Sequence, residues 1–374
     1  MNILALEPFY GGSHKAFLDG CSAHSKHDWT LLTLPAYKWK WRMRHSPATF
    51  AQETQKLLQE GKKFDLIFCS DMLPLAEFKG LVDNSIAKLP SIIYFHENQL
   101  TYPVQSESER DLHFALTNYL SMIASDQVWF NSQYHRDSFF NALQKFLLRM
   151  PDFNLLDMLE SVKQKSSLFP QAINRNPFKK TDKIFVPPIH IGWVARWEFD
   201  KNPELFFAVL KNLKSQNIPF KLSVLGEQFE NSPPIFEEAK KEFKDEIINY
   251  GYLPTQSEYQ KVLADIDIVI STADHEFFGI SIMEAIESGA YPLLPNKLSY
   301  PELLNLSEQK ENEKFFYNCT EQDLTEKLIK VIEQFNSTTV SFDLQEIADQ
   351  YYWTKIAILL DNRISELHQN LNNL

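Results

Sequence analysis

Hydrophobic positions along this 374-residue chain form two series of short apolar runs, with longer amphipathic stretches between the runs. An apolar run of about four to eight residues is typical of a strand buried on both faces, and an amphipathic stretch with helical periodicity is typical of a covering helix. Strands that alternate with helices favour a parallel sheet covered on both faces. The two series therefore predict an α/β protein with two Rossmann-like domains.

The first series covers residues 1 to about 135 and contains expected helices at Pro47–Gly61 and Leu112–Ala124. Its expected strands are Asn2–Leu6, Trp29–Leu34, Asp65–Cys69, Ser91–Phe95 and Gln127–Phe130. The second series has expected strands at Ile189–Val194, Phe220–Leu225, Ile247–Tyr250, Ile266–Ser271, Ala290–Leu294 and Phe315–Tyr317. Periodicity weakens between the series, so we expect domains at 1–180 and 181–350. A C-terminal helix, 351–374, should pack back toward the first domain.

Composition changes this picture little. The three cysteines have no metal-ligand spacing and indicate a reducing compartment. The N-terminus resembles a first strand and no signal peptide, and no apolar run is long enough to span a bilayer. We therefore expect a cytoplasmic protein without a membrane partner. The net charge of -12 disfavours a nucleic-acid partner unless cations cluster locally.

Such a cluster follows the second expected strand, where cations alternate with tryptophans over Lys38-Trp39-Lys40-Trp41-Arg42-Met43-Arg44-His45. Cations contact phosphates and indole faces stack on bases, so this segment is typical of a nucleic-acid contact loop. The alternative is a basic edge segment with its tryptophans in the core.

Other polar segments also follow expected strands, at the sheet edge where such folds bind ligands. Gly11 and Gly12 allow close backbone approach to a ligand, and Ser13 is a candidate cap for the next helix. A simple turn with a cap is the alternative. The segment His96-Glu97-Asn98-Gln99 is costly to place at a buried strand end without partners, so contact of His96 with substrate is at least as expected as a structural role.

In the second series, Arg196 and Lys201 follow a strand and precede a helix, as expected of ligands to a diphosphate. Surface ion pairing is the alternative. Tyr252-Leu253 follows another strand and is a candidate to flank a base. After the strand at Ile266–Ser271, Glu276 and Glu284 lie on either side of a glycine turn that begins a helix. A helix start binds anions, and the carboxylates suit sugar and ribose hydroxyls, so we expect a nucleotide-sugar site.

With these residues in place, the second half resembles the retaining glycosyltransferases of family 4, which have the GT-B fold of two Rossmann-like domains with parallel sheets facing a central cleft. The resemblance rests on Arg196 with Lys201, Gly251-Tyr252-Leu253, Glu276-Phe277-Phe278-Gly279 through Glu284-Ala285, Gly289 and Glu302.

The first half resembles the tRNA-queuosine alpha-mannosyltransferases. The motifs are Glu7-Pro8-Phe9-Tyr10-Gly11-Gly12-Ser13-His14, Lys40-Trp41-Arg42-Met43-Arg44, His96-Glu97-Asn98-Gln99-Leu100 with Tyr102-Pro103, and Phe130-Asn131-Ser132 with Tyr134-His135. This resemblance implies retaining transfer of mannose from GDP-mannose to the cyclopentenediol of queuosine in a tRNA anticodon, with tRNA-Asp as the expected tRNA. GT-B enzymes usually need no metal, so we expect neither metal nor cofactor.

The resemblance also implies roles for individual residues. The diphosphate would be held by Arg196 and Lys201, the ribose by Glu284, and the transferred sugar by Glu276, with His96 near that sugar. The remaining donor residues would be Gly11, Gly12, Ser13, Tyr252, Leu253, Phe277, Phe278, Gly279, Ile280 and Ser281. The tRNA or acceptor residues would be Lys38, Trp39, Lys40, Trp41, Arg42, Arg44, Asn98 and Gln99.

Three other functions stay open. The first is a GT-B glycosyltransferase with a lipid or small-glycan acceptor. The second is a GT-B nucleotide-sugar epimerase or hydrolase, which would not need the Trp-Lys-Trp-Arg segment. The third is a tRNA-binding protein with an inactive site. The sequence leaves the donor base, the sugar and the oligomeric state open.

Overall fold

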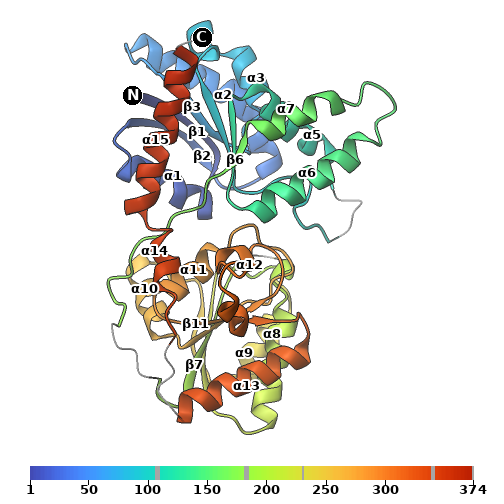
Figure 1. The fold of residues 1–374 in the computed structure, drawn as a ribbon, viewed down its shortest axis with the longest axis vertical. Helices are drawn as coiled ribbons and strands as arrows, with labels where there is room; N and C mark the ends of the chain where they lie inside the picture. The colour runs from blue at the N-terminus through green and yellow to red at the C-terminus, as the bar shows by residue number, and fades with distance from the viewer. Residues whose placement is uncertain (106–109, 181–184, 230, 338–341, 373–374) are drawn as a thin grey trace. The chain divides into compact units, whose positions relative to one another are not determined.

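A computed structural model describes residues 1–105, 110–180, 185–229, 231–337 and 342–372. The chain divides into two compact units, Met1–Ala172 with Trp353–Leu374, and Ile173–Tyr352 (Figure 1). The expected boundary at 180/181 falls at the edge of residues 181–184, which lie outside the described residues. Because Trp353–Leu374 group with Met1–Ala172, the C-terminal helix belongs to the first unit.

The first unit is a six-stranded sheet of order β2-β1-β3-β4-β5-β6 with parallel pairing throughout the described strands. Its strands are β1 Asn2–Tyr10, β2 Asp28–Pro35, β3 Leu66–Ser70, β4 Ser91–Phe95, β5 Gln127–Phe130 and β6 Ser166–Leu168. Its helices are α1 Gly12–His24, α2 Trp39–Gln59, α3 Leu75–Leu81, α4 Asn84–Ala87, α5 Leu112–Ala124, α6 Gln133–Leu147, the 3-10 helix η2 Leu156–Met158, α7 Leu159–Gln164 and α15 Trp353–Asn372.

The second unit repeats this plan with a parallel sheet of order β12-β11-β10-β7-β8-β9. Its strands are β7 Ile189–Val194, β8 Phe220–Leu225, β9 Ile247–Gly251, β10 Ile268–Ile270, β11 Tyr291–Pro295 and β12 Phe316–Tyr317. Its helices are η3 Phe199–Lys201, α8 Pro203–Ser215, α9 Ile235–Glu242, α10 Gln256–Asp265, α11 Ile280–Glu287, α12 Tyr300–Leu303, η4 Lys310–Phe315, α13 Glu321–Ser337 and α14 Gln345–Asp349.

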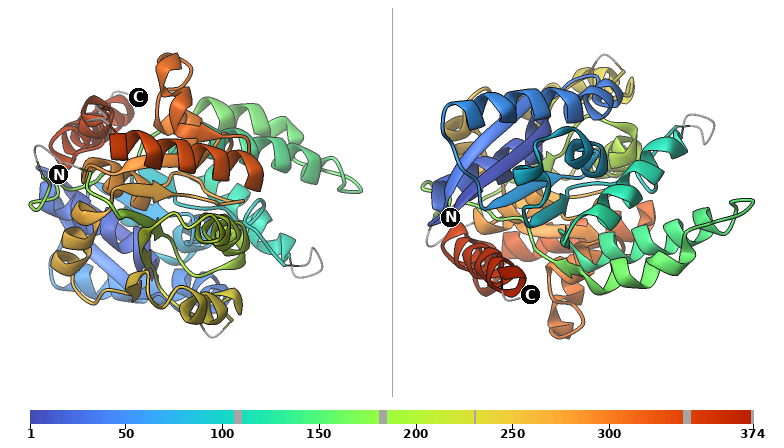
Figure 2. Two further views of the ribbon diagram at one scale, coloured as in Figure 1. Left: turned by 90° about the horizontal axis from the view of Figure 1, so that it is seen from below. Right: turned by 90° about the horizontal axis from the view of Figure 1, so that it is seen from above.

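Alternate residues of β1 face opposite layers, as expected for a strand buried on both sides. Leu4 and Leu6 pack in a cluster with Phe50 of α2. Ile3 and Ala5 pack in another cluster with residues of α1 and α15. The layers can be followed in Figure 2, where α2 and α15 lie on opposite faces of this sheet. Among the described residues, no helix is both long and apolar enough to cross a membrane.

The packing of α1 on α15 gives a stability prediction. A Cβ at Gly20 would overlap the indole ring of the buried Trp353. We therefore expect Gly20→Ala to lower the free energy of unfolding by about 1–3 kcal/mol through overpacking. Gly80→Ala is the matched control, because a Cβ in α3 would meet no described heavy atom within 4 Å. In thermal unfolding, Gly80→Ala should be at least as stable as the wild type. Equal melting temperatures for Gly20→Ala and Gly80→Ala would contradict the close packing of Gly20 on Trp353.

Two local expectations were wrong. Residues 39–44 are the first turns of α2, which contains Pro47 in its interior, so the expected contact loop is helical and the helix does not begin at Pro47. Proline is usually tolerated only in the first turn, which is why the expected start was too late. Ser13 does not cap α1: Gly11 is the N-cap, and no described side chain caps this helix.

Candidate active site

The turn between β10 and α11 in the second unit has a geometry that suits an anion. Gly279 is the N-cap of α11 at φ 98°, and no described side chain caps the helix. A Cβ at Gly279 would approach Tyr300 to 3.0 Å, so both conformation and space require glycine. The amide groups of the first turn therefore keep hydrogen-bonding capacity for an anion.

Lys201 and Glu276 meet beside this turn. Lys201 is buried, and its Nζ donates to the carbonyl of His275 at 2.6 Å and lies 3.4 Å from Glu276 Oε2 and 3.1 Å from Asp200 Oδ2. Glu276 Oε1 accepts from the amide groups of Phe277 at 3.1 Å and Phe278 at 3.4 Å. The carboxylate thus links the lysine to the backbone of the turn.

Electrostatics keep this pair charged. Burial alone lowers the pKa of Lys201, but the charges of Glu276 and Asp200 raise it above its ordinary value. Burial raises the pKa of Glu276, but the charge of Lys201, with other nearby groups, lowers it below its ordinary value. A buried ammonium beside an uncapped helix start suits a ligand with several negative charges.

Other predicted donor residues surround the pair. Lys201, Glu276 and Ser281 line one recess with Trp193 and Tyr300, and the Ser281 hydroxyl donates to the carbonyl of Val194 at 2.8 Å. Phe277 and Phe278 are buried, whereas Ile280 is half-buried. Arg196 differs from Lys201, because its side chain is 43% exposed and its guanidinium lies 3.1 Å from Glu198.

Glu284 lies within α11 and accepts at Oε2 from the Tyr259 hydroxyl at 2.9 Å. Burial raises the pKa of this carboxyl group to about 7, although the Tyr259 hydrogen bond lowers it. Tyr252, just after β9, is 69% exposed, and Leu253 is half-buried. These positions are compatible with ribose binding by Glu284 and with base contact by Tyr252.

In the first unit, the segment after β1 turns directly into α1. Gly12 has φ 51°, and a Cβ there would meet no described heavy atom within 4 Å. The backbone at Gly12 is therefore open to close approach by a ligand, whereas a Cβ at Gly11 would overlap the Cβ of Ala36. Contact of this segment with a ligand stays a prediction, and Ser13 does not cap the helix.

Two residues of the segment after β4, Asn98 and Gln99, were expected to contact the acceptor, and both bond to neighbouring residues of the segment. Asn98 is fully buried, and its Oδ1 accepts from the amide groups of Leu100 at 3.0 Å and Thr101 at 2.8 Å. Gln99 is also buried, and its Nε2 lies 3.3 Å from Glu97 Oε1. Because the side-chain oxygen of Asn98 accepts from these two amide groups, we infer that Asn98 fixes the shape of this turn.

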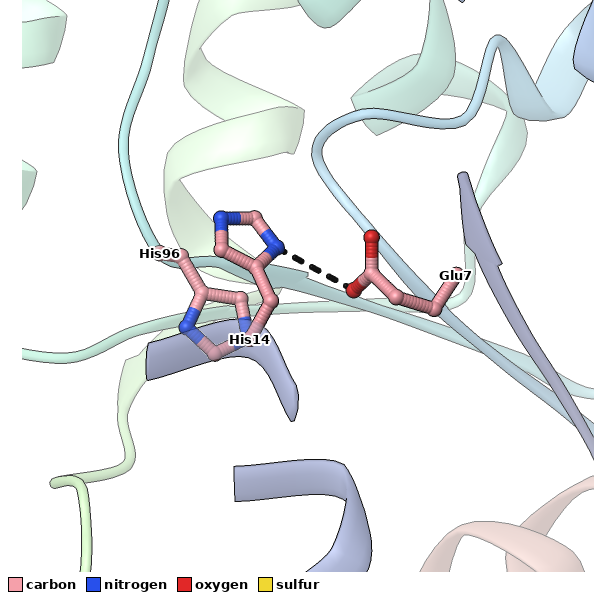
Figure 3. Close-up of side chains that lie close together, drawn as sticks. All are labelled: Glu7, His14 and His96. Carbon is pink, nitrogen blue, oxygen red and sulfur yellow. Dashed lines mark hydrogen bonds and ion pairs between the residues drawn. The ribbon is translucent and has the colours of Figure 1, made fainter. Parts of the chain in front are cut away.

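His96 lies in a buried cluster with Glu7 and His14 (Figure 3). His14 Nδ1 lies 3.1 Å from Glu7 Oε2, and the rings of His14 and His96 stack with centroids 4.0 Å apart. Within the described residues, this group is the one that could hold a metal ion, with its ligand atoms within 4.8 Å of one another. However, lone pairs lie in the plane of an imidazole, so two stacked rings direct them side by side and not toward one ion.

The first turns of α2 present three exposed side chains, Lys40, Trp41 and Arg44, to solvent. Trp41 is 62% exposed. Arg42 is buried instead, and its Nε donates to the carbonyl of Pro35 at 3.0 Å. Arg42 thus anchors the helix start, and the exposed cations that remain for a nucleic acid are Lys38, Lys40 and Arg44. Trp39 is half-buried and packs edge-on against Phe114.

Sequence reasoning assigned no role to several residues that contact these sites: Glu7, His14, Asp71, Gln171, Asp200 and Tyr259. A signal was available for Glu7, His14 and Asp71, which are polar residues at or just after strand ends. Gln171 and Tyr259 reach their partners only through the tertiary fold, and nothing in their sequence neighbourhood distinguishes them.

Comparison with known proteins agrees with this geometry. Residues 2–173 match the family model described as tRNA-queuosine alpha-mannosyltransferase N-terminal, and residues 174–339 match glycosyl transferases group 1. A tRNA-queuosine alpha-mannosyltransferase of Drosophila melanogaster is 40% identical over 337 residues, which are 87% of this chain and 86% of that protein.

Solved structures show the same fold. Sucrose-phosphate synthase from Thermosynechococcus elongatus superposes with a TM-score of 0.74 at 13% identity, over 99% of this chain and 100% of that one. Anabaena HepE in complex with UDP superposes with a TM-score of 0.68 at 17% identity, over 98% and 100% of the two chains. The protein is thus a glycosyltransferase with the GT-B fold, and it belongs to the tRNA-queuosine alpha-mannosyltransferase family.

Proposed function

We propose that this protein transfers mannose from GDP-mannose to the cyclopentenediol of queuosine in a tRNA anticodon, with retention of configuration, and that tRNA-Asp is its acceptor. The observation that carries the proposal is the 40% identity to a tRNA-queuosine alpha-mannosyltransferase, which extends over 87% of the chain. The paired Lys201 and Glu276 at the start of α11 support a nucleotide-sugar donor. No metal or cofactor is needed in this proposal.

In the proposed reaction, negative charge develops on the diphosphate as the bond from the sugar to GDP breaks. Lys201, Arg196 and the amide groups at the start of α11 would stabilise that charge. Fixed donors aimed at a developing charge are commonly the largest catalytic contribution, about 10²–10³-fold for each donor. Glu276, held by Lys201 and the turn, would bind sugar hydroxyls, so attack by the queuosine hydroxyl on the same face of the sugar is the mechanism we favour.

Donor identity is tested by calorimetric titration of the protein with GDP-mannose, UDP-glucose and ADP-glucose. We expect GDP-mannose to bind at least about tenfold more tightly than the other two, a difference of about 1.4 kcal/mol. Equal affinities would contradict GDP-mannose as the donor. Transfer assays with separately purified queuosine-containing tRNAs then show whether tRNA-Asp is the acceptor.

The binding of GDP-mannose should depend on pH through Glu284. Ribose hydroxyls donate to the ionised carboxylate, and the pKa of Glu284 is about 7 in the free protein. As the pH falls through 7, Glu284 takes up a proton and loses accepting capacity, so the Kd should rise about tenfold from pH 8 to pH 6. Glu284→Gln should bind weakly at both pH values. An unchanged Kd for the wild type across this range would exclude Glu284 as the ribose ligand.

A further inference from the structure

Five polar side chains that are each less than a tenth exposed converge at the carboxyl edge of the first sheet. They come from the end of β1, from α1, and from the segments after β3, β4 and β6: Glu7 at 3%, His14 at 5%, Asp71 at 0%, His96 at 7% and Gln171 at 3% exposure. Burying so many polar groups is costly unless they bond to one another. The bonds that they make assign protons to particular atoms.

His96 is fixed through both its backbone and its ring. Its amide group donates to Asp71 Oδ1 at 2.9 Å, and its carbonyl accepts from Asn131 Nδ2 at 3.0 Å. Its Nδ1 lies 3.2 Å from Gln171 Nε2. With the Gln171 amide oriented so that its Nε2 donates, Nδ1 of His96 accepts, and the proton of the neutral imidazole is then on Nε2.

His14 carries the positive charge of the stacked pair. Glu7 is held by three donors, with Oε2 next to His14 and Oε1 accepting from the Phe9 amide group at 2.8 Å and the Ser70 hydroxyl at 2.9 Å. Burial lowers the pKa of His14, but Glu7, with smaller contributions from Asp71 and Glu97, raises it to about 9. Burial, together with the charges of His14 and His135, lowers the pKa of His96 well below its ordinary value.

We propose that Glu7 and His14 are positioning residues that hold a cation against the face of the buried His96 and thereby reinforce the effect of burial in keeping His96 neutral, with its Nε2–H available as a hydrogen-bond donor to a sugar or acceptor hydroxyl. The role of that donor rests on the proposed mannosyl transfer. A second positive charge on a ring stacked at 4.0 Å would repel the first, which is how the His14 cation acts on its neighbour. In this proposal the positive charge of the cluster is the proton on His14 and not a metal ion.

The groups around His96 determine what a pH experiment reports. Those that titrate or carry charge are Glu7, His14, Asp71, Tyr94, Glu97 and His135. Burial raises the pKa of both Asp71 and Tyr94 well above the ordinary values. In the wild type neither stacked histidine is expected to change protonation between pH 5.5 and pH 8, so a change in that range in the variants must be assigned to His96 by NMR and distinguished from Asp71 and His135.

The test combines Glu7→Gln, which removes the carboxylate charge, with His14→Phe, which keeps a stacked ring without the cation. Without the cation, the pKa of His96 should rise, although burial still holds it below its ordinary value. At saturating donor and tRNA, kcat of both variants should fall more steeply than that of the wild type as the pH is lowered from 8 to 5.5, because a larger fraction of His96 then takes up a proton. Ser70→Ala is the control, because it removes a hydrogen bond to Glu7 but no charge, and its pH profile should match the wild type.

NMR of histidine-labelled wild-type protein gives an independent readout without substrate. His14 should titrate near pH 9, and His96 should stay neutral down to pH 5.5. Titration of His96 near its ordinary pKa, or a uniform loss of kcat at every pH in Glu7→Gln and His14→Phe, would overturn the proposal. Loss of activity on chelation, restored by Zn²⁺, would also overturn it in favour of a metal. If the wild type transfers no sugar, the proposed function fails while NMR still decides the protonation of the pair.

Discussion

Lys201→Met is expected to lower the rate of mannosyl transfer by about 10²–10³-fold, the loss typical of removing one fixed donor to a developing charge. Methionine fills a similar volume but cannot neutralise a diphosphate. Because Nζ of Lys201 lies 3.1 Å from Asp200 and 3.4 Å from Glu276, the substitution also leaves two carboxylates without their shared cation. Removing one partner of a buried ion pair commonly costs about 3–5 kcal/mol of stability.

Two controls separate catalysis from folding. Arg196→Ala removes a cation whose side chain is 43% exposed, so transfer should fall by at least about tenfold with an unchanged melting temperature. Asp200→Asn disturbs the buried charges but retains Lys201, so transfer should stay close to that of the wild type. The measurements are kcat and KM for GDP-mannose below the melting temperature of each variant. Loss of a cationic donor to the diphosphate should lower kcat by at least about tenfold. If Lys201→Met folds and its kcat stays within about threefold of the wild-type value, Lys201 does not bind the diphosphate.

Neutralising Lys40 and Arg44 together is expected to weaken tRNA binding by at least about tenfold at low salt, because each exposed cation in α2 would lose a phosphate contact. Each lost contact should also reduce the slope of log affinity against log salt by about 0.7–0.9. Trp41 is 62% exposed in the same turn, so Trp41→Ala should weaken binding by about 1–3 kcal/mol through lost stacking, with the salt slope unchanged.

Lys62→Gln with Lys63→Gln is the matched control, since both lysines are exposed in the first unit and the net charge changes equally. This control should keep the wild-type affinity and salt slope. If the pair at Lys40 and Arg44 behaves like the control, the exposed face of α2 does not contact tRNA. Arg42 should not be included in the substitution, because its bond to Pro35 supports the helix start.

The strands were the most predictable part of the fold. Ser91–Phe95 and Gln127–Phe130 occur within the expected bounds, because continuous apolar runs have few other stable environments. Strand β6, Ser166–Leu168, was not expected, because three residues with two serines give no apolar run. The start of α2 was missed because its cations and tryptophans resembled a contact loop, and Pro47 indicated a later start.

The candidate donor site was predictable where a motif brings residues together within one turn, as with Glu276 and Gly279. Its burial and partners were not, because Lys201 reaches Glu276 only when η3 and the turn before α11 fold together. The stacking of His14 on His96 was likewise invisible, since it depends on the neighbouring ends of β1, β3 and β4 and on the position of α1. The sequence thus predicted which residue types gather at these sites, whereas the protonation and exposure of each side chain depend on tertiary contacts.

The most direct measurement of the proposed activity is the mass of nucleosides released from queuosine-containing tRNA after incubation with the protein and GDP-mannose. We predict that queuosine gains the mass of one hexose as an α-mannoside, and that the same tRNA carrying guanosine at that position stays unmodified. Unmodified queuosine together with release of free mannose would contradict mannosyl transfer to tRNA and would indicate hydrolysis of the donor.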